Sequence, residues 1–152
     1  MNIVLETEEL LIDIRTKSHE ECANTITEVE ARYRTEAGNH KNEEIYRCLL
    51  ESASALSRIL ARFLHSDNTW EADDTANITD GFQYDFDVSE RRMDGKSQAL
   101  ADAMHSYIVH DTLRRFYGTV SAADLATKHT ALAQEAEAAI KEMMYSKKPP
   151  II

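Results

Sequence analysis

The sequence has little glycine and proline, few cysteines and no long hydrophobic run, and each shortage excludes a class of protein. Four glycines and two prolines among 152 residues argue against a collagen-like chain and against a turn-rich β-sandwich. No apolar run approaches the roughly 20 residues that a membrane-spanning helix needs. Residues 1–6 lack the basic and apolar stretches of a signal peptide. We therefore expect no membrane contact and a cytoplasmic location.

Cations are scarce relative to anions. The chain has 17 Lys and Arg residues against 27 Asp and Glu residues, which gives a net charge of −10. A domain this acidic repels nucleic acid and anionic membrane surfaces, so we expect no direct nucleic-acid contact. The hydrophobic fraction of 43% argues against disorder. A chain of this length can bury a core without the help of a disulfide or a metal.

Motifs of the common catalytic and metal sites are also missing. Cys22 and Cys48 have no zinc-binding spacing, and the sequence has neither a GxSxG segment nor the clustered glycines of a phosphate loop. Asp102 and His105 share one face of an expected helix, but a di-iron bundle needs a second such pair. We expect no enzyme, no metal and no cofactor. His105 and His129 are expected to be hydrogen-bonded at the edge of the core.

Helical periodicity dominates what the sequence does contain. Apolar residues recur at steps of three and four, which predicts a helix beginning near Thr7 and further helices over residues 41–65, 96–117 and 121–145. Residues 18–37 leave two alternatives open: one helix that Ser18 caps together with Glu21, or a break near Asn24. The apolar stripes predict a single core cluster of Leu49, Leu56, Leu60, Leu100, Met104, Ile108, Leu125 and Leu132.

One segment has a different period. Residues 82–88 alternate aromatic or β-branched side chains with polar ones, which predicts a β-strand. Its one available partner is the short apolar segment at residues 2–5. We therefore predict a mainly α fold, a bundle of four to five helices with a short strand or a two-stranded ribbon of about residues 2–5 and 82–88. Residues 1–145 form a single helical domain, and residues 146–152 form a short basic, proline-containing tail.

A two-stranded ribbon is marginally stable alone and leaves open edges. Open edges can extend a sheet across subunits, so we predict that residues 82–88 pair with a strand of another copy or of another structural protein. Arg114 and Arg115 suit the negative end of a helix dipole, whereas the arginines that follow the strand have no local role. We expect them to dock on the partner's acidic surface. The predicted interaction residues are Phe82, Tyr84, Phe86, Val88, Arg91 and Arg92.

The order of these features resembles that of a known group of proteins. The strand-like GFQYDFDVSERRMDGK is followed by LADAMHSYIVHDTLRRFY and then by the tail MMYSKKPPII. This pattern resembles small uncharacterised proteins encoded in phage-like gene clusters of gut Bacteroidetes. It is loosely similar to the helical head–tail connector (head completion) proteins of tailed phages. The resemblance is best over residues 82–150 and implies a virion or prophage structural protein without catalytic residues.

Together these observations favour a non-enzymatic, oligomerising structural or adaptor protein, such as a component similar to a head–tail connector. Its partners would be other copies of itself or other structural proteins, and we expect a homo-oligomer in the assembled state. The resemblance would place it in the virion. The alternative is a small regulatory or ligand-binding helical bundle, in which Tyr84, Phe86, Tyr107 and Phe116 line an apolar pocket.

Overall fold

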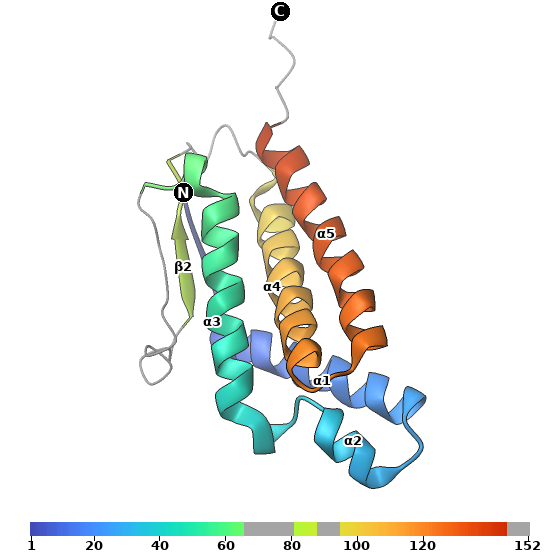
Figure 1. Cartoon of the computed structure of the whole chain (residues 1–152). Coiled ribbons are helices and arrows are strands. Elements are labelled where there is room, and N and C mark those ends of the chain that lie inside the picture. Colours follow the sequence, from blue (N-terminus) through green and yellow to red (C-terminus); the bar gives the residue numbers. More distant parts are fainter. Residues whose placement is uncertain (66–80, 88–94, 146–152) are drawn as a thin grey trace, which may run out of the picture.

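A computed structural model describes residues 1–65, 81–87 and 95–145. These residues confirm the expected fold class, since they form five α-helices and a two-stranded antiparallel sheet (Figure 1). The predicted tail lies outside the described residues. The elements in chain order are β1 (Asn2–Leu5), α1 (Thr7–Thr25), α2 (Val29–Thr35), the 3-10 turn η1 (Asn39–Lys41), α3 (Asn42–Ile59), the 3-10 turn η2 (Ala61–Phe63), β2 (Phe82–Asp85), α4 (Ser97–Thr119) and α5 (Ala123–Tyr145).

Helix α4 lies at the centre of the bundle. Helices α3 and α5 run alongside it, and α1 crosses below them at a steep angle (Figure 1). The two strands lie on the outer side of α3. Because α4 packs against α1, α3 and α5, buried side chains occur all around it, which explains why its apolar residues form a broad band rather than a narrow stripe.

The first helix runs past the capping box predicted at Ser18. That residue lies inside α1 and is fully buried, and its hydroxyl oxygen accepts hydrogen bonds from the Ala37 backbone N–H at 2.8 Å and from the Tyr117 hydroxyl at 2.9 Å. A buried hydroxyl with two partners ties distant segments together instead of starting a helix. Helix α1 ends at Thr25, and the backbone of Ile26 is extended. The alternative with a break in the helix near Asn24 is therefore the correct one.

The two strands pair in a fixed register. Ile3 lies opposite Tyr84 and Leu5 opposite Phe82, and the alternating side chains of both strands point into the core. At the end of the ribbon the Phe86 N–H donates to the Met1 carbonyl at 2.7 Å, and the Met1 ammonium donates back at 3.2 Å. This mutual bonding identifies Met1 and Phe86 as a hydrogen-bonded pair of an antiparallel ladder.

Gly81 allows β2 to begin directly against the end of β1. Its φ is 151°, and a Cβ added there would lie 2.6 Å from the carbonyl oxygen of Leu5. A larger residue at this position would therefore clash with the backbone and adopt a strained conformation. The glycine is needed at the point where the ribbon meets the start of α1.

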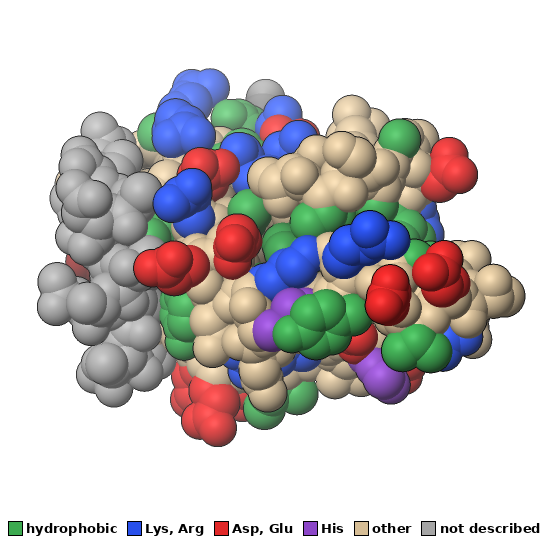
Figure 2. All heavy atoms as spheres, turned by 60° about the horizontal axis from the view of Figure 1, so that its bottom comes forward, with side chains coloured by type: hydrophobic (Ala, Val, Ile, Leu, Met, Phe, Trp, Pro, Cys, Tyr) green, Lys and Arg blue, Asp and Glu red, His purple; other side chains and the backbone are tan. Residues whose placement is uncertain are grey.

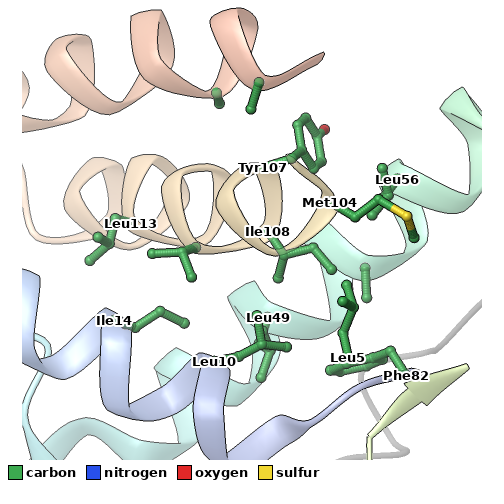
Figure 3. Close-up of a cluster of buried hydrophobic side chains, with 14 of the residues drawn as sticks. Leu5, Leu10, Ile14, Leu49, Leu56, Phe82, Met104, Tyr107, Ile108 and Leu113 are labelled. Carbon is green, nitrogen blue, oxygen red and sulfur yellow. The ribbon is translucent and has the colours of Figure 1, made fainter. Parts of the chain in front are cut away.

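The predicted core cluster is confirmed for seven of its eight members. Leu49, Leu56 and Met104 are fully buried and lie with residues of the ribbon, α1 and α4 in one cluster (Figure 3). The eighth member, Leu132, is half-buried and lies outside that cluster. The reason is that α5 packs through smaller side chains as well, including Ala133 and Ala136, so its buried face is narrower than its apolar stripe.

Candidate interaction site at the edge of the sheet

The aromatic residues predicted to contact a partner lie in the core. Phe82, Tyr84 and Phe86 are each 0% exposed, and the Tyr84 hydroxyl donates to the Ala53 carbonyl of α3 at 2.8 Å. Their side chains are therefore not available to another chain while this fold is intact. The other predicted interaction residues, Val88, Arg91 and Arg92, lie outside the described residues.

The same burial bears on the alternative hypothesis of an apolar ligand pocket. Tyr107 is 7% exposed and Phe116 is 0% exposed, so both pack in the core as Tyr84 and Phe86 do. Three grooves on the described part of the chain, one beside β1 and two near α2, are lined by none of the four.

Strand β2 also has neighbours on both sides, which corrects the expectation that its edge is open. Beyond β1, the residues after η2 approach its other side: the His65 N–H donates to the Asp85 carbonyl at 2.9 Å, and the Asp87 N–H donates to the Phe63 carbonyl at 2.7 Å. The chain can make this approach because α3 ends at Ile59 and η2 turns it toward the ribbon. Among the described residues, the edge of the ribbon that stays open is therefore the outer edge of β1.

Val4 presents its backbone on that outer edge. Hydrogen-bonded and non-hydrogen-bonded pairs alternate along an antiparallel ladder. Since Met1 and Phe86 form a bonded pair, the pair of Val4 with Gln83 is a non-bonded one, and the N–H and C=O of Val4 point away from β2. Among the described residues, no hydrogen bond reaches these two groups.

A groove of about 500 Å³ runs beside this edge, between β1, the first half of α1 and the first half of α4; we call it the edge groove. Its apolar lining includes Val4, Ile12 and Ala101. Val4 is 51% exposed and Ile12 is 54% exposed, which makes them two of the few large apolar side chains that the described surface leaves open. Exposed apolar groups that gather beside a hydrogen-bonding edge are typical of interaction sites.

The polar lining of the edge groove is mainly acidic. It contains the carboxylates of Glu6, Glu9, Asp13 and Asp102, and neither Lys nor Arg contributes to it. Asp13 is paired with His105, whose Nε2 lies 2.5 Å from a carboxylate oxygen. Asp102 accepts a hydrogen bond from the Gln98 amide at 2.8 Å. For Glu6 and Glu9, the described residues provide no ion-pair partner.

The surface at the α1–α2 end of the bundle differs from the edge groove because its charges are mixed. There acidic and basic side chains are interleaved, with hydrophobic and His side chains between them (Figure 2). Helix α2 exposes Val29 and Tyr33, and the Tyr33 ring stacks on His40 with 3.9 Å between the ring centroids. This face has no single sign of charge and no open strand, so the edge groove is the better candidate.

A buried polar network joins α1, α4 and α5, and most of its contacts are not predicted by the sequence pattern. The carboxylate of Glu21 accepts from His129 Nε2 at 2.7 Å and from Lys128 Nζ at 2.7 Å. The Nδ1 atom of His129 lies 2.9 Å from the Nδ1 atom of His110. His129 is hydrogen-bonded as expected, but it is 1% exposed, which places it within the core rather than at its edge. Both of its ring nitrogens are engaged, so it has no atom to offer to a substrate.

Burial and charge set the protonation of this network. Burial, together with the neighbouring His129 and Lys17, lowers the pKa of His110 from 6.5 to about 4, although Glu21 opposes them. Burial would raise the pKa of Glu21, but the hydrogen bonds from His129 and Lys128 outweigh it and bring the pKa to about 2. The network therefore contains a permanent carboxylate beside a pair of imidazoles.

Arg114 and Arg115 hold a buried carboxylate and do not act at the helix end. Asp111 is 3% exposed, and it accepts from Arg114 at 2.8 Å and from Arg115 at 2.8 Å. Arg115 also reaches Glu51 of α3 at 3.2 Å. The role in the helix dipole predicted for these arginines is wrong because α4 continues to Thr119. Their spacing of three and four from Asp111 is visible in the sequence and could have identified the contact.

Comparisons with known proteins provide no further assignment. No protein-family model, no curated protein and no solved structure matches the chain. Within the described residues, no group of three or more His, Cys, Asp or Glu side chains is placed to hold a metal ion. None of the helices described is both long and apolar enough to cross a membrane.

Proposed function

We propose that the protein is a non-enzymatic structural adaptor, which joins another structural protein by adding one of that protein's strands to the outer edge of β1. The observation that carries this proposal is that the N–H and C=O of Val4, a residue that lines the edge groove, point away from β2 and have no partner among the described residues. Main-chain pairing at a sheet edge provides affinity, and neighbouring pockets provide register.

The resemblance to head–tail connector proteins agrees with this role, since a connector works by attaching one structural protein to another. The proposal moves the attachment from the strand at residues 82–88, as the sequence predicted, to the other strand of the same ribbon. A homo-oligomeric assembly and a location in the virion stay predictions.

Val4→Pro tests the proposal directly. Proline removes the outward N–H and places its ring on the open edge, while the ladder with β2 does not use that N–H. Val4→Thr is the matched control because it keeps the N–H and the β-branched shape. The probe is a fluorescent heptapeptide of alternating Ser and Val, titrated with each full-length protein while anisotropy is measured.

We expect saturable binding to the parent and to Val4→Thr, and loss of binding in Val4→Pro. Helical circular dichroism and the thermal transition should be the same in both variants, which would show that the fold is retained. Equal binding by the two variants, or no saturable binding by the parent, would contradict strand addition at this edge.

A further inference from the structure

The edge groove also restricts the chemistry of the strand that it accepts. We infer that its occupant is an extended, cationic segment of a different protein, in which Lys or Arg alternates with apolar residues. This inference rests on the proposed function, since it assigns the occupant of the same site.

The alternation follows from the two sides of an added strand. Successive side chains of a strand point to opposite faces, so one set would point toward the bundle, where Ile12 and Ala101 provide apolar lining. The other set would lie on the outer side of the ribbon, which carries the exposed side chains of Val4 and Glu6. A segment with one apolar and one cationic face meets both linings at once.

Charge selects cations over other polar groups. The four carboxylates of the groove repel an acidic strand, and Glu6 and Glu9 have no ion-pair partner among the described residues. Asp13 is already paired with His105, so we assign the main contribution to the two glutamates. Each exposed ion pair stabilises a complex modestly and depends on salt.

The same charge argues against a second copy as the occupant. Two chains that each carry a net charge of −10 repel each other at low ionic strength. Rim charges of opposite sign also accelerate association with a basic partner. A partner protein with a basic, β-prone segment is therefore favoured over self-association at this groove.

The experiment compares three heptapeptides in which Val alternates with Lys, Ser or Glu. In low salt we expect the Lys peptide to bind the parent roughly 3- to 10-fold more tightly than the Ser peptide. The Glu peptide should bind most weakly, and added salt should remove the advantage of Lys. The double variant Glu6→Gln with Glu9→Gln should bind the Lys and Ser peptides equally well.

Glu8→Gln is the matched control, because Glu8 also lies in the first turn of α1 but does not line the groove. It should leave the preference for the Lys peptide unchanged. The single variant Glu9→Gln is measured beside it and should weaken the preference. If Glu8→Gln reduced the preference as much as Glu9→Gln does, the effect would come from net charge and the inference would be wrong.

Two further outcomes separate this inference from the proposed function. If the Lys and Ser peptides bind equally well and both are lost in Val4→Pro, strand addition holds and the cationic partner is wrong. If binding of the Lys peptide needs the glutamates but survives Val4→Pro, the charge preference holds and strand addition is wrong. Light scattering that shows self-association of the parent, abolished by Val4→Pro, would instead identify a second copy as the occupant.

Discussion

The contact between His110 and His129 predicts that mild acid destabilises the fold. Since the two Nδ1 atoms lie 2.9 Å apart, only one proton fits between them. A second positive charge on the pair would place two N–H donors face to face. The folded protein therefore holds at most one charge on this pair, whereas both imidazoles are protonated in the unfolded chain at low pH. The groups that face His110 are His129 and Lys128 of α5, and Lys17 and Glu21 of α1.

The direction in which pH changes the free energy of unfolding follows from proton linkage. The pKa of His110 is lowered from 6.5 to about 4 in the folded protein, so the unfolded chain binds more protons between these two values. The free energy of unfolding must therefore decrease as the pH falls through this window. Each pH unit corresponds to about 1.4 kcal/mol, and partial exposure of the ring reduces the effect. We expect a loss of about 2 kcal/mol between about pH 7 and about pH 4.5 from this group.

Urea unfolding followed by circular dichroism measures this loss at the two pH values. The test variant is His110→Gln, which retains a polar side chain but cannot take up a proton. The control is His19→Gln, because the His19 side chain is 72% exposed. The control should lose as much stability in acid as the parent, and His110→Gln should lose about 2 kcal/mol less. An equal loss in the parent and in His110→Gln would refute the reasoning.

Three substitutions test the packing by urea unfolding at neutral pH. Leu56→Ala should cost about 2–5 kcal/mol, since the side chain is fully buried, and a change below about 0.5 kcal/mol would mean that this face of α3 is not in the core. Gly81→Ala should cost about 1–3 kcal/mol, because its Cβ would meet the Leu5 carbonyl oxygen at 2.6 Å; an unchanged stability would contradict the close approach. Tyr84→Phe should cost about 0.5–1.5 kcal/mol, because it removes the hydroxyl donor while the Ala53 carbonyl keeps its place in the hydrogen bonding of α3, and a neutral effect would mean that this hydrogen bond contributes nothing.

The helices were predictable because their signal is local. A stripe such as that of α3, with Ile45, Leu49 and Leu56 buried in turn, needs a single contiguous face and no knowledge of its neighbour. Helix α1 was less clear because Ser18 and Cys22 continue its buried face with small, polar or weakly apolar side chains. Ser18 has the chemistry of a cap, and its use in tying Ala37 to Tyr117 depends on segments far along the chain.

The ribbon was predictable as a pair of strands, but its open edge was not. Alternation determines which side chains of residues 82–86 are buried. It carries no information about which neighbours occupy the two edges of the strand. The approach of Phe63 and His65 depends on where α3 ends and how η2 turns. That turn determines that β1 is the strand left open.

The buried network could not be assembled from the sequence for a related reason. Glu21 and His129 are separated by 108 positions, and nothing in the local pattern pairs them. The sequence shows only that His129 lies on the apolar face of its helix, and that position alone predicts a hydrogen-bonded histidine. The partner follows from the crossing of α1 under α4 and α5 (Figure 1), which is a property of the packed bundle.

The buried polar network and the edge groove differ in whether their polar groups already have hydrogen-bond or ion-pair partners. In the network, Glu21 and both nitrogens of His129 have partners, so binding another group there would first break existing bonds. At the edge groove, Val4 has outward backbone groups and a half-exposed side chain, and Glu6 and Glu9 have no cation among the described residues. A cationic strand would satisfy all of these groups without disturbing the core. We therefore expect a ligand to bind at the edge groove rather than at the network, which stabilises the bundle that holds β1 in place.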